Sequence, residues 1–455
     1  MALTRLFEIS SKSLATYQRA LSISSNNIAN AANPNYSRQR AQLTTTEPDH
    51  STNVELGTGV DITDVQRVRN TILDSQIRKY NGYKEDADYR TSVMGNIESL
   101  YSEPTDAGLS NLMKKFFNSW NELANDPSSI SYRNQVVNAA RQMTDKISSI
   151  YSGMDVVRSD LKADTSEAVK SINRILTNLA DVNQQIYNAS TTGKTVNTLM
   201  DSRDQLLKEL SKYANLNVHI NDDNTATVSM GGVNVIDRAN AYELSVNTVN
   251  SGGRNKLQVL VHGDTSLRLN SGKLNAMLDI YNNKIEDYKS AIDTIANSIM
   301  DNVNSVHTTM QTIETPPQTN VKFFTSYSAG KLEINTDILS DPKKIAVSSD
   351  GSDGNSDGAI QIANLADENL IDGESFSGKY SDLLTDIANE KSTNTKQGET
   401  FDLVLQQLDS QQSQESGVNV DEEMVNVLKY QRSYDASAKL IKIADDILRT
   451  LIEMV

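Results

Sequence analysis

The chain has 455 residues, 37% of them hydrophobic, no cysteine and a formal net charge of -16 at pH 7. A chain of this length holds about two to four domains, and its acidic balance argues against a nucleic-acid partner, because phosphate backbones are bound through clustered lysine and arginine. The lack of cysteine excludes disulfide bonds and thiolate metal ligands. No apolar run is long enough for a membrane span or a cleavable signal peptide.

An amphipathic helix is predicted over the first thirty residues. Apolar and small side chains recur there in alternating steps of three and four, so one face of the helix forms a stripe that requires a partner helix. The apolar members of this stripe, which we expect to be buried in an assembly, are Leu3, Phe7, Leu14, Tyr17, Leu21 and Ile28. Residues 1–40 also carry five basic side chains against Glu8, which favours docking on an acidic neighbour; ordinary scatter of charge is the alternative.

A turn and a connector follow this helix. The segment Asn33-Pro34-Asn35 ends the periodic pattern, because proline fixes one backbone angle and asparagine tolerates a left-handed conformation. From there to about residue 68 we expect a polar, mostly extended connector.

Three helices come next. The first two cover about 70–102 and 106–126, each ended by a proline. The third begins near Ser131, keeps a strict heptad of apolar residues to Leu161, slips in phase at 168–172 and then resumes. At 1.5 Å per residue, a helix of about 58 residues spans roughly 85 Å, which is too long for a compact domain.

The middle of the chain changes its period. Residues 197–214 predict another helix, after which alternating apolar residues and glycine turns predict a small β insert over 216–270. Helical phase returns over 274–310, short strands and loops mix over 321–364, and a further helix covers about 380–413.

The last predicted helix runs from the Ser416-Gly417 break to the end of the chain. It carries a second heptad stripe, whose one polar member is Ser437 and whose other members are Val427, Tyr430, Tyr434, Ile441, Ala444, Leu448, Leu451 and Val455. Chain ends usually fray because nothing buries them. Amphipathic helices at both ends therefore indicate burial against each other, against copies of the chain, or both.

Together these elements predict a mainly α-helical, elongated, multi-domain fold with a small β insert. We expect three domains. They are a terminal coiled coil of residues 1–35 and 420–455, an elongated helical domain of residues 36–215 and 271–419, and a small outer β domain of residues 216–270.

Residues with catalytic or metal-ligating spacing are not found. The histidines His50, His219, His262 and His307 are scattered, and we expect them to be solvated or half-buried. No serine has a nucleophile-elbow context and no glycine-rich loop leads into a lysine. We therefore expect no enzymatic activity and no cofactor.

One segment is similar to a calcium loop. Asp353–Gly358 matches the first six positions of an EF-hand loop, but Asn364 occupies the place of the bidentate glutamate. We expect a solvated loop, and weak Ca²⁺ binding stays open.

A charged cluster lies in the helix over 197–214. Asp201, Arg203 and Asp204 follow one another beside a leucine stripe that includes Leu206. From the residues alone, we interpret these charges as a solvated helix face.

Three segments carry a family resemblance. The turn after the first helix resembles the N-terminal signature of bacterial flagellar axial proteins, the proteins of rod, hook and junction. Its residues here are Asn26, Asn27, Ile28, Asn30, Tyr36 and Arg38. The segment after Ser416 is similar to the matching C-terminal signature, through Gly417, Val418, Asn419, Asp421 and Glu422. Residues 199–207 resemble a segment of the hook-associated protein 1 (FlgK) family that rod and hook proteins lack.

The chain departs from the family pattern at two places. Asn35 stands where the family has glycine, and we expect asparagine to be tolerated because it also adopts positive φ. Longer members carry an extra outer domain between a region like Phe323-Phe324 and one like Leu332–Ile334. Only about seven residues join these regions here, so we expect the chain to lack that domain.

The resemblance implies a non-enzymatic adapter at the hook–filament junction, outside the cell. It implies export through the flagellar type III apparatus without a cleavable signal peptide, protection of the C-terminal helix by a cytoplasmic chaperone, and a ring of roughly a dozen copies. The hook protein and a second junction protein are the implied neighbours.

Other functions stay open at this point. Within the same class, the chain could be a hook subunit or the second junction protein. Outside it, a wall hydrolase would need a carboxylate pair or a metal triad, and a free coiled-coil tether or adhesin would keep ordered terminal helices as a monomer.

Overall fold

The computed structural model describes residues 2–48, 57–101, 103, 105–192 and 196–454. Its α-helices are α1 Ala2–Ala29, α2 Thr71–Tyr101, α3 Leu109–Asn125, α4 Ile130–Thr191, α5 Asn197–Ser211, α6 Lys273–Asp279, α7 Ile285–His307, α8 Thr336–Ser340, α9 Asp357–Asn364, α10 Phe376–Ser416 and α11 Val420–Glu453. A π-helix covers Ile280–Lys284 and a 3-10 turn Pro342–Lys344. The strands are β1 Gln39–Thr45, β2 Val60–Arg67, β3 Leu216–Ile220, β4 Ala226–Met230, β5 Val233–Asp237, β6 Asn240–Ala241, β7 Leu244–Ser251, β8 Arg254–Val261, β9 Thr265–Ser266, β10 Phe324–Ser328 and β11 Lys331–Ile334.

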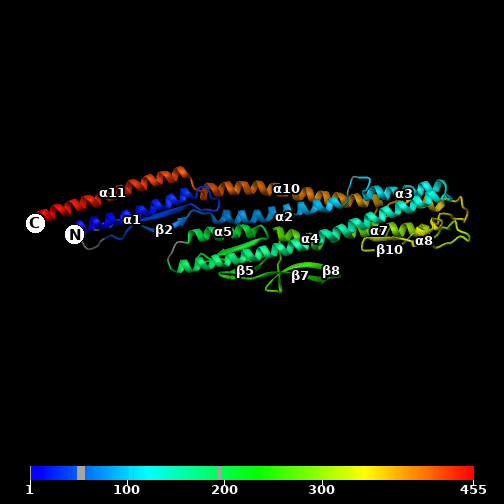
Figure 1. The fold of residues 1–455 in the computed structure, drawn as a ribbon, viewed down its shortest axis with the longest axis horizontal. Coiled ribbons are helices and arrows are strands. Elements are labelled where there is room, and N and C mark those ends of the chain that lie inside the picture. The colour runs from blue at the N-terminus through cyan, green and yellow to red at the C-terminus, as the bar shows by residue number, and fades with distance from the viewer. Residues whose placement is uncertain (1, 49–56, 102, 104, 193–195, 455) are drawn as a thin grey trace.

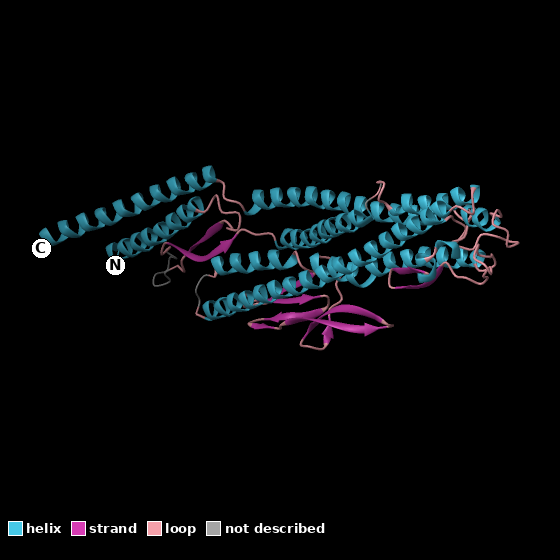
Figure 2. Ribbon diagram, turned by 45° about the vertical axis from the view of Figure 1, so that its right-hand side comes forward, coloured by secondary structure: helices cyan, strands magenta, loops and turns pink. Residues whose placement is uncertain are grey.

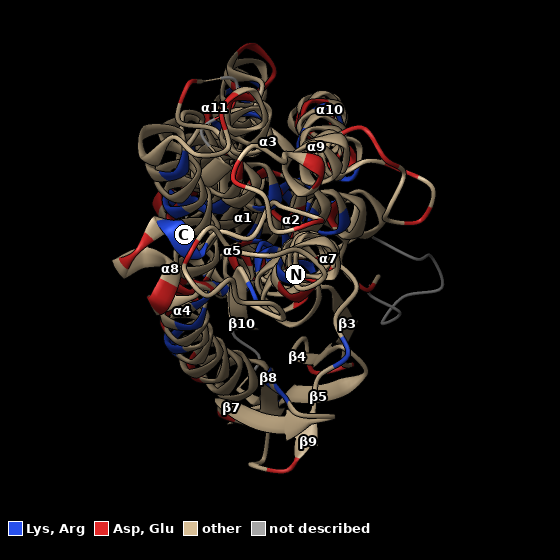
Figure 3. Cartoon of the chain, turned by 90° about the vertical axis from the view of Figure 1, so that its right-hand side faces the viewer, with Lys and Arg blue, Asp and Glu red and all other residues tan. Residues whose placement is uncertain are grey.

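The molecule is a long rod of near-parallel helices. Helices α2, α4, α7 and α10 run along its length, while α1 and α11 form a separate pair at one end, where both termini lie (Figure 1). The strands β3 to β9 gather on one side of the helices (Figure 2), and the view along the rod shows them outside the helical bundle (Figure 3). The expected fold class, mainly helical and elongated with small β elements, is confirmed.

Helix α4 is 62 residues long and connects two cores. Up to Leu161 its heptad residues belong to a large apolar cluster with α2, α3, α7 and α10, and from Ala168 onward they belong to a second cluster with α5 and the β strands. The phase slip at 168–172 falls where the partner of α4 changes. A stutter rotates the apolar stripe around the helix, which allows one straight helix to serve both cores.

The outer β region consists of two small sheets, ordered β3-β4-β5-β6 and β7-β8-β9, with antiparallel neighbours. Side chains of helical asparagines bind it to the rod by pairing with strand backbone. Asn173 of α4 contacts both backbone groups of Leu244 at 2.8 Å, and Asn282 of the π-helix contacts both groups of Leu257 at 2.7 and 2.9 Å. These amides satisfy strand groups that would otherwise be left without partners.

The short link after Phe324 is a β-hairpin. Strands β10 and β11 pair antiparallel, with Phe324 opposite Ile334. Ala329 and Gly330 have φ of 48° and 78°, the left-handed values of a type I′ turn. The two regions between which we expected longer relatives to carry an extra domain are thus joined here by one β-hairpin with a two-residue turn.

The histidines do not all fit the expectation. His219 and His262 are exposed, and His50 lies outside the described residues. His307 is fully buried, which corrects the expectation that it would be solvated or half-buried. Its Nδ1 donates to the carbonyl oxygen of Val321 at 2.6 Å, and its Nε2 accepts from the backbone N–H of Ala346 at 2.9 Å, so a neutral ring satisfies both partners.

We expect His307 to make the protein less stable in mild acid. Burial lowers the pKa of His307 to about 4 from the ordinary value of 6.5. The unfolded chain therefore binds more protons between these values, and stability falls as pH falls through this window. Urea unfolding should show a loss of about 2 kcal/mol from pH 7 to pH 5 that the His307→Gln variant lacks. An equal loss in both proteins would contradict the assignment.

In the loop that is similar to a calcium site, the side chains form hydrogen bonds with one another. Asp357 begins α9, and its side chain accepts hydrogen bonds from Ser349 and Asn355 of the same loop. Within the described ranges, no group of three or more histidine and acidic side chains could hold a metal ion. Weak binding of Ca²⁺ by residues 353–358 stays untested. No helix in the described part of the chain is long and apolar enough to cross a membrane.

Candidate assembly site

Helices α1 and α11 pack antiparallel at the end of the rod (Figure 1). Among the buried residues of the two helices are four small ones, Ser10, Ser24, Ser437 and Ala444, and the rings of Tyr17 and Tyr430 stack at 6.5 Å. Small side chains bring the helices close, so the apolar residues beside them are covered only in part.

The expected stripe residues divide into three groups. Ala444 is fully buried, whereas Leu448 and Leu451 are exposed, and Val455 lies outside the described residues. The half-buried members are Leu3, Phe7, Leu14, Tyr17, Leu21, Ile28, Val427, Tyr430, Tyr434 and Ile441.

A hairpin covers a second face of α1. Strands β1 and β2 pair antiparallel, with Gln39 opposite Arg67, so the segment expected to be an extended connector is a β-hairpin along α1. Thr16 donates to the carbonyl oxygen of Val60 at 3.0 Å, and Ala20 is fully buried beside it. Sequence reasoning missed this contact because Thr16 and Ala20, which are buried beside the hairpin, lie outside the expected apolar stripe of α1.

Asn27 and Tyr36 close the turn after α1. Asn27 is fully buried, and its Oδ1 accepts from the Tyr36 hydroxyl at 2.8 Å and from the Gln39 N–H at 3.0 Å. Its Nδ2 donates to the Gln39 carbonyl oxygen at 2.8 Å. Burial raises the pKa of Tyr36 to about 12, so its hydroxyl stays a donor. The neighbouring Asn30 donates to Asn26 at 2.9 Å, closing the end of the helix.

The role expected for Asn35 was wrong. Its φ is not positive; instead, its backbone N–H donates to Oδ1 of Asn33 at 3.1 Å. The side chain of Asn33 closes the turn in this way, so no left-handed residue is needed at position 35.

Replacing Asn27 by alanine should destabilise the terminal helices. The change leaves the two partly buried backbone groups of Gln39 and the Tyr36 hydroxyl without this partner, which costs about 1 kcal/mol for each lost hydrogen bond. Hydrogen exchange of α1 and β1 would measure the loss. Asn26→Ala, at an exposed position one residue earlier, is the matched control, and equal exchange in the two variants would refute this role.

The C-terminal motif begins α11. The side chain of Asn419 accepts hydrogen bonds from the N–H groups of Asp421 and Glu422 at 3.0 and 3.3 Å and so caps the helix. A Cβ on Gly417 would lie 2.2 Å from the Ser413 carbonyl oxygen, so only glycine fits there. Val418 is half-buried in the short link between α10 and α11.

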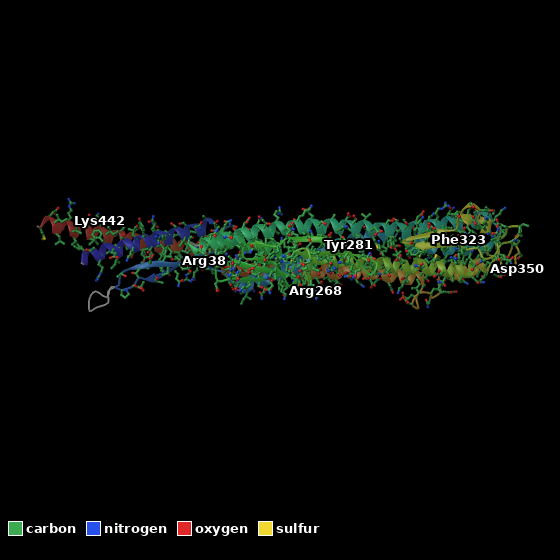
Figure 4. The ribbon with its side chains drawn as sticks, turned by 90° about the horizontal axis from the view of Figure 1, so that it is seen from below. Arg38, Arg268, Tyr281, Phe323, Asp350 and Lys442 are labelled. Atoms are coloured by element: carbon green, nitrogen blue, oxygen red, sulfur yellow. The ribbon has the colours of Figure 1, made fainter. Side chains whose placement is uncertain are left out.

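Arg38 connects the two motifs. Its Nε contacts Glu423 at 2.7 Å, its NH1 contacts Glu422 at 2.8 Å, and its backbone N–H donates to the Ser416 carbonyl oxygen at 3.0 Å. Figure 4 shows Arg38 where the terminal helices meet the rest of the rod. One basic residue of the N-terminal arm thus docks on acidic residues of the same chain.

A further apolar stripe on α11 flanks the seam with α1. Leu440, Ile443, Ile447 and Met454 follow helical spacing and are between 41% and 78% exposed. A contiguous exposed apolar stripe of this kind is typical of a contact surface. Lys442 lies on the polar side of the same helix and is exposed.

The charged cluster of α5 is not a solvated face. Asp201, Arg203 and Asp204 are all buried, together with Leu207 and Leu210 rather than Leu206. The reading from sequence was wrong because Arg67, which pairs with both carboxylates, lies more than 130 residues earlier in the chain.

Family models match two parts of the chain. The model described as "Flagellar hook-associated protein FlgK helical domain" matches residues 94–324, just over half of the chain, and "Flagellar basal body rod FlgEFG protein C-terminal" matches residues 410–454.

Relatives match along almost the whole chain. The "Flagellar hook-associated protein 1" of Bacillus subtilis (strain 168) is 27% identical, covering 98% of this chain and 97% of its own. The protein of the same name from Salmonella typhimurium is 22% identical, covering 96% and 97%. The solved flagellar hook junction protein FlgK from Burkholderia pseudomallei has a similar fold, with a TM-score of 0.64 at 12% identity, over 74% of this chain and 99% of that one.

An elongated helical chain, with both ends paired and an apolar stripe left uncovered, has the architecture of a structural subunit. The family model that matches the helical domain identifies the kind of structural subunit. The chain belongs to the family of the flagellar hook-associated protein FlgK.

Proposed function

We propose that the chain is a structural adapter of the bacterial flagellum at the junction of hook and filament, and that it acts without catalysis. The observation that carries this proposal is the exposed stripe of α11, Leu440, Ile443, Ile447 and Met454, beside a seam already filled by α1. Neighbouring copies would cover this stripe by helix packing, as apolar helix faces do in coiled coils. The names of the relatives point to the same role.

Copies would form a ring of roughly a dozen, because a head-to-tail contact that closes on itself gives cyclic symmetry. The neighbours would be the hook protein on one side and a second junction protein on the other. The chain would be exported by the flagellar type III apparatus without a cleavable signal peptide, and a cytoplasmic chaperone would cover the C-terminal helix beforehand. Its place of action would then be outside the cell.

In this role the chain would be divided into three domains. Residues 1–35 and 420–455 would form the inner coiled coil, residues 36–215 and 271–419 the elongated helical domain, and residues 216–270 the outer β domain. The separate terminal pair and the β strands outside the bundle support this division (Figure 2). The hairpin β1–β2 would belong with the inner part, since it packs on α1.

Localisation and substitution test the role together. A labelled chain should appear at the tip of the hook in cells that lack the filament protein. The double change Ile443→Asp and Ile447→Asp should abolish this signal without unfolding the isolated chain, because both side chains are exposed. Lys442→Asp, which places the same charge on the polar side, should keep the signal. The proposal would be contradicted if the wild-type chain were secreted uniformly into the medium and gave no signal at the hook.

A further inference from the structure

Two parts of the molecule meet at a joint. We call α1, β1, β2 and α11 the terminal unit and all other described elements the body. Two short segments, residues 68–70 and 417–419, join them covalently. The described residues form three clusters of buried apolar side chains, and none contains a residue of the terminal unit. The joint is therefore not closed by an apolar core that extends across it.

Asp201 of the body contacts the terminal unit directly. Its Oδ1 accepts from the Ser37 hydroxyl at 2.6 Å and from NH1 of Arg67 at 2.7 Å, and its Oδ2 accepts from the Ser37 N–H at 3.3 Å. Ser37 precedes β1 and Arg67 ends β2, so one carboxylate holds both strands of the hairpin at their base. Asn197, one turn earlier on α5, donates to the carbonyl oxygen of Val65 at 2.8 Å.

Asp204, one turn later on α5, completes the contact. Its Oδ2 accepts from NH2 of Arg67 at 2.9 Å, while its Oδ1 accepts from Arg203 at 2.8 and 3.0 Å. Arg67 thus uses two nitrogens on two different carboxylates. Arg203 also donates to the carbonyl oxygen of Asn224 in the β region, which fixes the cluster to the body.

Arg69 ties the segment after β2 into the same cluster. Its Nε and NH2 contact the two oxygens of Asp74 at 2.7 and 3.0 Å, and its NH1 donates to the Ser37 hydroxyl at 3.0 Å. Gln412 of α10 donates to the same Asp74 carboxylate at 2.6 Å. The cluster therefore joins the hairpin, α2, α5 and α10.

The carboxylate of Asp204 stays charged. Burial alone would raise the pKa of Asp204, but Arg203, Arg67 and Arg69 overcome burial and hold this pKa below its ordinary value. A buried ion pair contributes little more stability than apolar side chains packed in its place. Removing one partner is costly, however, and the hydrogen bonds of the pair form only in a narrow range of geometries. Such contacts set an angle better than an apolar surface, along which helices can slide.

We propose that Asp201 and Asp204 are positioning residues that hold the terminal unit at one angle to the body. The apolar clusters keep the body folded, and the ionic cluster sets the direction in which the terminal helices leave it. Loss of Asp201 releases Ser37 at the base of the hairpin and leaves the Arg67 side chain paired with Asp204 alone, so the angle between the terminal unit and the body is held less tightly.

Distance measurements between spin labels on the full chain test this. The chain has no cysteine, so Ser11→Cys on α1 and Asn178→Cys on α4, both exposed, give a pair across the joint. Asn178→Cys with Ser381→Cys gives a pair within the body. Asp279→Ala is the matched control for Asp201→Ala, because it removes a carboxylate paired with Arg90 at 2.6 Å inside the body.

One narrow distance peak across the joint is expected in the wild type and in Asp279→Ala. Asp201→Ala should replace it by a broad distribution, while the distance within the body and the melting temperature of the body stay unchanged. Ser37→Ala removes only the hydroxyl and leaves no unpaired charge, so it should broaden the same peak to a smaller degree even if Asp201→Ala folds poorly. An unchanged peak in both variants overturns the proposal, and so does a wild-type peak as broad as that of Asp201→Ala. Because no flagellum is needed, this result is independent of the proposed junction role.

Discussion

Replacing Gly272 by alanine is expected to lower the free energy of unfolding by about 2–6 kcal/mol, the largest loss of stability that we expect from a single substitution. Gly272 has φ of 95° and ψ of 161°, a conformation that only glycine adopts readily. A Cβ there would lie 2.5 Å from the backbone of Tyr213 and Ala214, which cannot move aside as a flexible side chain can.

The position also joins several elements. The N–H of Gly272 donates to the Gly82 carbonyl oxygen of α2 at 3.0 Å, and the next N–H, of Lys273, donates to the carbonyl oxygen of Lys212 after α5 at 3.0 Å. A Cβ would push these contacts apart where α2, α5 and α6 meet. We therefore expect the substitution to destabilise both α5, which precedes the β region in the chain, and α6, which follows it.

Urea unfolding measures the effect, and Gly252→Ala provides the control. Gly252 also has positive φ, 63°, but no atom lies within 4 Å of its would-be Cβ. The free energy of unfolding of the control should fall only by the cost of placing alanine in a left-handed backbone conformation, about 1–2 kcal/mol. Equal losses in the two variants would show that the close approach at Gly272 does not matter.

The long helices could be predicted from sequence because their signal is local. The heptad of α4 places Val136, Ala140 and Met143 on one face, and all three are fully buried. The period alone shows this face, whichever partner covers it. The phase slip was visible as well, but its reason, the change of α4 from one core to another, depends on elements far away in the chain.

The joint could not be predicted for the opposite reason. Asp201 was interpreted as part of a solvated helix face, since charged side chains are seldom buried without a partner, and nothing local in the sequence marks Arg67 as that partner. Their pairing depends on the fold bringing β2 beside α5. The hairpin itself gave a weak signal, because its contacts on α1 include Thr16 and Asn27, which are polar and lie outside the apolar stripe read from the sequence.

Replacing Ala444 by glutamate is expected to abolish filament formation and swimming. Ala444 is fully buried where α11 meets α1, so a glutamate there must either bury an unpaired charge or force the helices apart, at a cost of several kcal/mol. Separation of the pair would also displace the exposed stripe of α11, on which we propose that copies assemble. The body should keep its melting temperature, because its three apolar clusters include no residue of α11.

Swimming in soft agar and electron microscopy of filaments measure the outcome, and hydrogen exchange of α11 in the purified chain measures the local effect. Lys442→Glu is the control, since it adds the same side chain two residues earlier on the polar side of α11. It should leave filaments and exchange rates unchanged. Normal filaments with Ala444→Glu would show that the α1–α11 pair is not needed for assembly. If hydrogen exchange of α11 is also faster in that variant, the substitution has opened the α1–α11 pair. Normal filaments would then contradict the proposed mechanism of assembly.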